Sequence, residues 1–71
     1  MMSSEQLDLI RGDLASLSER LADVALDLLH EAMADPDPKQ SVAAKQERLV
    51  TRARRSVEKA DQLLRSIDRG S

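Results

Sequence analysis

The chain has 71 residues and a net charge of -2, and it contains no Phe, Tyr, Trp or Cys. A chain of this length forms one small domain, residues 1–71, which buries only about 60% of the surface that the unfolded chain exposes. Without aromatic side chains or disulfides, so small a core needs another source of stability. We therefore expect the protein to be a homo-oligomer.

The first predicted helix covers about residues 4–34. Ser3 is followed three residues later by Gln6, which is the spacing of a capping box and places the helix start near Ser4. The segment 35–38 reads Asp-Pro-Asp-Pro. Proline removes a backbone donor and disfavours helical geometry in the residue before it, so this segment is predicted to be a turn.

The second predicted helix covers about residues 38–69. Asp37 is the expected N-cap, Pro38 lies in the first turn, and Gln40 is at the third helical position, N3. Gly70 is the expected stop at the C-terminal end.

Each predicted helix carries an apolar row at alternating steps of three and four, the period of a coiled-coil seam. The rows are Leu7, Ile10, Leu14, Leu17, Leu21, Val24 and Leu28, and then Gln46, Val50, Ala53, Val57, Ala60, Leu64 and Ile67. If the chain folds back at Asp37, residues whose numbers add up to about 74 face each other, such as Leu21 and Ala53. The sequence thus predicts an all-α fold, an antiparallel two-helix hairpin with a coiled-coil seam.

A further group of apolar residues lies outside these two rows and near the predicted turn. Its members are Ala22, Leu26, Leu29 and Met33 on the first helix, with Val42 and Leu49 on the second. An exposed apolar patch usually marks an interface. We expect these residues to bind a partner, most simply a second copy in a four-helix bundle; the alternative is a broad core face with scattered surface leucines.

Basic residues follow one face of the second helix at steps of three and four: Lys45, Arg48, Arg52, Arg55 and Lys59. This stripe has three interpretations: a solvated face that complements the acidic first helix, a surface for an acidic protein partner, or a surface for a phosphate backbone. The net negative charge and the lack of aromatic residues for base stacking disfavour nucleic acid.

No nucleophile motif, phosphate-binding loop or zinc spacing is present, so we expect no enzymatic activity, no cofactor and no metal site. No apolar run approaches the ~20 residues of a membrane span, and the N-terminus lacks the pattern of a signal peptide. These features predict a cytoplasmic protein without a membrane role, and the preference for Arg over Lys suggests a bacterial GC-rich genome.

The expected function is a self-associating interaction or regulatory module. The alternatives are nucleic-acid binding through the basic residues and an accessory subunit of a larger complex.

Overall fold

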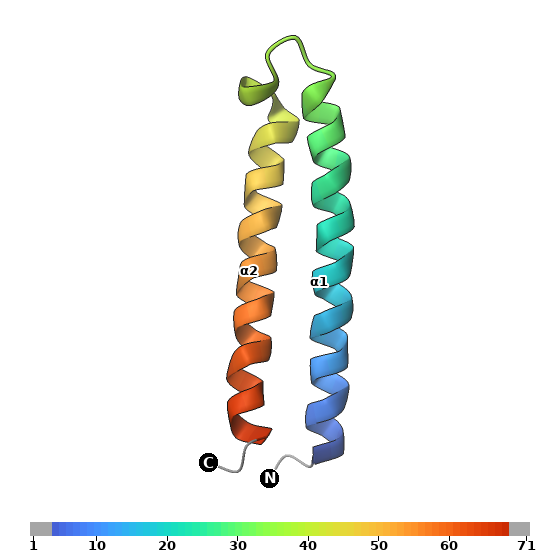
Figure 1. Ribbon diagram of the computed structural model, residues 1–71, viewed down its shortest axis with the longest axis vertical. Helices are drawn as coiled ribbons and strands as arrows, with labels where there is room; N and C mark the ends of the chain where they lie inside the picture. Colours follow the sequence, from blue (N-terminus) through green and yellow to red (C-terminus); the bar gives the residue numbers. More distant parts are fainter. Residues whose placement is uncertain (1–3, 69–71) are drawn as a thin grey trace.

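Two long helices run antiparallel and side by side in the computed structural model, which describes residues 4–68 (Figure 1). Helix α1 spans Ser4–Met33 and helix α2 spans Val42–Asp68. A short 3-10 helix, η1, spans Pro38–Gln40 between them. Within the described residues there is no strand, so the predictions of an all-α fold and of a hairpin are confirmed. Ser3 and Gly70, the predicted cap and stop, lie outside the described residues.

The turn corrects the predicted start of the second helix. Asp37 makes no side-chain capping bond and precedes only the 3-10 helix η1. The cap of α2 is Ser41, whose Oγ accepts a hydrogen bond from the Ala44 N–H at 3.0 Å and donates one to the Pro38 carbonyl at 2.9 Å. Pro38 still has a role in the turn, because its carbonyl oxygen is the acceptor that orients the Ser41 hydroxyl. This arrangement fits the preference for Ser at helix N-caps.

The two helices meet along rows that differ in part from the predicted seam. On α1 the inward row contains the predicted leucines and, between them, polar and small residues: Leu7, Arg11, Leu14, Ser18, Leu21, Ala25, Leu28 and Ala32. On α2 the corresponding row is Glu47, Val50, Arg54, Val57, Asp61 and Leu64. Both rows keep alternating steps of three and four, so the coiled-coil period of the seam is retained.

The other half of each predicted row lies outside the seam. Ile10, Leu17 and Val24 are 39%, 44% and 45% exposed, and Ala53 is also exposed. The predicted pairing of Leu21 with Ala53 is therefore wrong. Cross-helix polar contacts join residues whose numbers add up to 72 rather than 74, as in Arg54 with Ser18.

This difference has a physical cause in the width of the apolar faces. Each helix has an apolar face broader than one partner helix can cover, since a helix in a two-helix hairpin is covered on one side only. The two helices meet along one edge of each apolar face, where polar residues of one helix form contacts with polar residues of the other. Of the large apolar side chains, only Leu7, at 5% exposed, is buried in the hairpin; Ala32 and Ala44 are the other buried apolar residues among 4–68.

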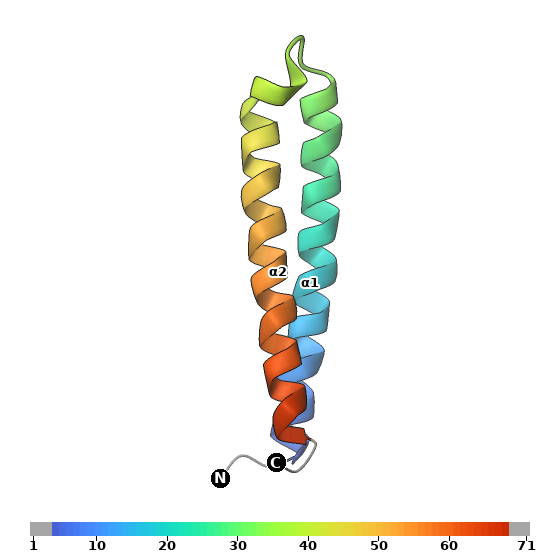
Figure 2. The same cartoon turned by 60° about the vertical axis from the view of Figure 1, so that its left-hand side comes forward.

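The hairpin is long and narrow, with extents of 53 × 17 × 14 Å. Turning the view by 60° keeps the two helices adjacent along their length (Figure 2). Neither helix within residues 4–68 combines the length and apolar character needed to cross a membrane.

Candidate functional site

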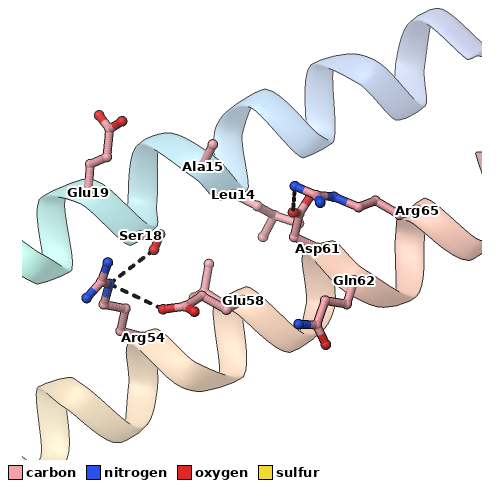
Figure 3. Close-up of a pocket in the computed structure, with 10 residues that line it drawn as sticks. Leu14, Ala15, Ser18, Glu19, Arg54, Glu58, Asp61, Gln62 and Arg65 are labelled. Atoms are coloured by element: carbon pink, nitrogen blue, oxygen red, sulfur yellow. Dashed lines mark hydrogen bonds and ion pairs between the residues drawn. The ribbon is translucent and has the colours of Figure 1, made fainter.

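A shallow groove runs between the helices on one side of the hairpin (Figure 3). It is lined by Leu14, Ala15, Ser18 and Glu19 from α1 and by Arg54, Val57, Glu58, Asp61, Gln62 and Arg65 from α2. Ala15 of α1 and Glu58 of α2 both line the groove. The flank of α1 that carries Ala15 and the flank of α2 that carries Glu58 therefore lie on the same side of the hairpin. We call this side of the hairpin the groove side.

The charged groups of the groove contact each other. Asp61 receives Arg65 from the same helix at 2.9 Å and Arg11 from α1 at 3.6 Å. Arg54 donates to the Ser18 Oγ at 3.2 Å and lies 3.3 Å from a carboxylate oxygen of Glu58. These contacts tie the helices together at two levels, and they neutralise much of the charge that a ligand would need to meet.

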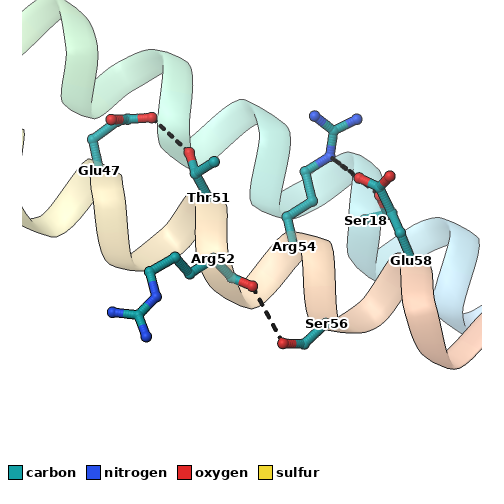
Figure 4. A network of polar contacts seen from close by, with 7 residues as sticks. All are labelled: Ser18, Glu47, Thr51, Arg52, Arg54, Ser56 and Glu58. Carbon is teal, nitrogen blue, oxygen red and sulfur yellow. Dashed lines mark hydrogen bonds and ion pairs between the residues drawn. The ribbon is translucent and has the colours of Figure 1, made fainter.

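Additional polar contacts lie along α2, one of them part-buried and the other exposed (Figure 4). The Thr51 hydroxyl donates to the Glu47 carboxylate at 2.6 Å, and the Ser56 hydroxyl donates to the Arg52 carbonyl at 3.3 Å. Both are contacts between residues four apart on one helix, so the residues involved are satisfied locally. Local bonds of this kind stabilise side-chain positions without linking the helices.

The apolar residues Ala22, Leu26, Leu29 and Met33 of α1 lie on the groove side. Ala22 and Leu29 follow Ala15 at steps of seven, which keeps them on the same flank of the coiled coil. Leu26, Leu29 and Met33 are exposed, and Ala22 is half-buried. The structure thus brings these four residues together as one surface near the turn.

Val42 and Leu49 do not join that surface. Val42 lies two heptads before Ser56, and Leu49 lies one heptad before it. All three positions are on the side of α2 that faces away from the groove residues Glu58 and Arg65. The side chains of Val42 and Leu49 are strongly exposed. The partner-binding residues named from the sequence therefore divide between two opposite sides of the hairpin, although all of them except Ala22 are exposed.

The side opposite the groove carries a surface that we call the uncharged face. On α2 it is a second row at steps of four and three: Val42, Gln46, Leu49, Ala53, Ser56, Ala60, Leu63 and Ile67. On α1 it contains Ile10, Leu17 and Val24, which lie on the flank of the seam away from Ala15. Every residue is exposed except Ala60, which is half-buried. No member of the face is charged, although a third of the chain is.

Sequence reasoning assigned most of these residues to the intramolecular seam and so missed them as a surface. The signal that could have separated the two roles was the second heptad row of α2, which begins at Val42 and runs parallel to the row through Val50 and Leu64. Two apolar rows on one helix require two partners, and the hairpin supplies only one.

The basic stripe lies where the sequence places it, on the side of α2 away from α1. All five residues are exposed, and within residues 4–68 none of them forms an ion pair. Three of them, Arg48, Arg52 and Arg55, surround a shallow hollow together with Glu47 and Thr51. The stripe is therefore a cationic surface, and it borders the uncharged face on α2, because Arg52 lies four residues before Ser56 and Lys45 four residues before Leu49.

No family model matches the chain, and no curated protein or solved structure matches it either. The residues and contacts of this chain are therefore the guide to its function.

Proposed function

We propose that this protein is a non-enzymatic interaction module of the bacterial cytoplasm, a helical hairpin that self-associates and then binds another protein. The observation that carries the proposal is the exposure of apolar side chains. Among the described residues, eleven large hydrophobic side chains are exposed, from Met33 at 73% to Ile10 at 39%. A soluble hairpin with this surface is expected to cover much of it by association.

The dimensions of the hairpin support an interface of ordinary size. One flat side, 53 Å long and 17 Å wide, presents on the order of 800 to 900 Å², close to the ~800 Å² that each partner contributes to a standard interface. The small intramolecular core supports the same conclusion, because association would supply the burial that the isolated hairpin lacks.

The test of self-association is sedimentation equilibrium of the full chain at micromolar concentrations. We expect a mass of at least twice the 7.9 kDa of one chain, with dissociation on dilution. A folded 7.9 kDa monomer at every concentration tested would contradict the proposal.

A second candidate function is nucleic-acid binding, and the exposed basic stripe is the observation that favours it. Five phosphate contacts would give a log-log salt slope of about -4 to -5 on duplex DNA. We expect no binding at about 150 mM salt, where the screening length is ~8 Å. Tight, salt-sensitive binding in an anisotropy titration, lost in the variant Arg52→Glu with Arg55→Glu, would favour the nucleic-acid function instead.

A third candidate is an accessory subunit that is stable only within a larger complex. The small buried core is the observation that favours it. A chain of this kind would be unfolded by circular dichroism when purified alone, whereas the self-associating module is expected to be helical.

A further inference from the structure

The central part of the α2 row, from Leu49 to Leu63, reads nearly the same in both directions from Ser56, whereas Gln46 and Ile67 further out differ in polarity. Leu49 lies seven residues before Ser56 and Leu63 lies seven after it, while Ala53 and Ala60 lie three before and four after. The residues at the centre of the row have small side chains, and a leucine lies on each side of them along the helix. A row with this symmetry can pair with an antiparallel copy of itself, placing small residues against small residues and leucine against leucine.

The α1 row of the same face has a matching centre. Leu17 has Ile10 seven residues before it and Val24 seven residues after it. An antiparallel copy of α1 centred on Leu17 would therefore pair Ile10 with the Val24 of the second copy, and Leu17 with itself. Both helices of the hairpin thus show the pattern that an isologous two-fold interface requires, in which residue i contacts residue j and j contacts i.

The two centres lie at the same level of the hairpin. The cross-helix contact between Ser18 and Arg54 shows that residues whose numbers add up to 72 are level. Leu17 and Ser56 add up to 73, an offset of one residue or about 1.5 Å along the helix axis. One two-fold axis perpendicular to the helices can therefore pass through both centres.

Charges beside the α1 row agree with the same axis. Asp13 lies four residues before Leu17 and Arg20 three after it, both exposed on the outer edge of this side. They are seven residues apart on one helix, about 10 Å, and cannot contact each other within the chain. Across the two-fold axis, Asp13 of one copy meets Arg20 of the other, twice per dimer.

We propose that the occupant of the uncharged face is a second copy of this chain, related by a two-fold axis through the level of Leu17 and Ser56. In the resulting four-helix bundle, α1 pairs with α1 and α2 with α2, both antiparallel, and the two turns lie at opposite ends. The small residues Ala53, Ser56 and Ala60 allow the two α2 helices to approach closely. This arrangement rests on the proposed self-association. It specifies in addition which face of the hairpin is buried and which symmetry relates the two copies.

The groove side and the basic stripe remain outside this bundle. Leu26, Leu29 and Met33 on the groove side are then free to meet the other protein that the module binds. The division of the apolar residues between two sides thus corresponds to two different roles, assembly on one side and partner recognition on the other.

Disulfide formation at Ser56 tests the arrangement, because the chain has no cysteine of its own. Ser56→Cys places its thiol on the axis, where the two Cα atoms of an antiparallel pair come within the roughly 4.4 to 6.8 Å that a disulfide spans. We expect rapid covalent dimer formation under mild oxidation. Arg52→Cys, on the basic stripe, is the matched control and should remain mostly uncrosslinked.

Spin labels at Lys45→Cys give a second readout that leaves every residue of the uncharged face unchanged. Lys45 lies eleven residues from Ser56, so the two labels are about 33 Å apart along the axis in the proposed bundle and level with each other if the turns share one end. Crosslinking at Ser56 with a label separation above about 30 Å would support the arrangement. A dimer without Ser56 crosslinking, or with the labels level, would overturn it and leave self-association standing. A monomer would overturn both proposals.

Discussion

The substitution Leu63→Ala tests whether the uncharged face carries the association. Leu63 is 60% exposed in the hairpin, and the change removes three carbon atoms from its side chain. At ~0.8 kcal/mol for each fully buried methylene, covering the exposed part of these atoms contributes about 1.4 kcal/mol per side chain. A two-fold dimer contains the substitution twice, so the loss is about 3 kcal/mol, or roughly 100-fold in Kd.

Leu9→Ala is the matched control for this measurement. Leu9 is 66% exposed, but it lies on the outer side of α1, away from both the uncharged face and the groove. Leu and Ala are both strong helix formers, so neither change should reduce helicity in circular dichroism. Sedimentation equilibrium should show a large rise in Kd for Leu63→Ala and less than a twofold change for Leu9→Ala. Equal effects of the two substitutions would refute the assignment of the face.

The remaining predictions concern the cap, the surface of α1 and the charges beside the two-fold axis. Ser41→Ala removes the cap of α2 and should lower the free energy of unfolding by about 1 to 2 kcal/mol in thermal denaturation, whereas Ser16→Ala on the exposed surface should not lower it; equal losses would argue against the cap. Gly12→Ala should raise stability by up to about 1 kcal/mol, because a Cβ there would meet nothing within 4 Å; a loss of stability would show a hidden contact. Asp13→Arg and Arg20→Asp should each weaken the dimer, and the double variant should restore it in the same sedimentation assay. Failure of the double variant to restore binding would remove this ion pair from the interface.

The helices and the hairpin could be predicted from the sequence because local signals determine them. The two prolines of the turn cannot continue a helix, and the heptad spacing through Leu7, Leu14, Leu21 and Leu28 identifies the side of α1 that meets α2. All four leucines lie on the inward row in the structure. The turn was less predictable, because both Asp37 and Ser41 have side chains that can cap, and only the folded backbone decides between them.

The residues of the seam could not be predicted exactly, because the apolar face of each helix is wider than the strip that one partner helix covers. A sequence shows that Leu17 and Ser18 are adjacent positions on the helix, but apolar periodicity alone favours Leu17 for the core. In the structure Ser18 takes that place, where Arg54 donates to it, and Leu17 moves to the uncharged face. A choice between neighbouring rows depends on polar contacts across the helices, which no local pattern encodes.

Small-angle X-ray scattering of the full chain distinguishes lateral pairing of two hairpins from a monomer and from an end-to-end dimer. The forward intensity gives the mass and the distance distribution gives the length of the same particle. We predict twice the 7.9 kDa of one chain in a particle little longer than the 53 Å hairpin, because the copies lie side by side over their whole length. A mass of 7.9 kDa, or a doubled mass in a particle about twice as long, would rule out lateral pairing.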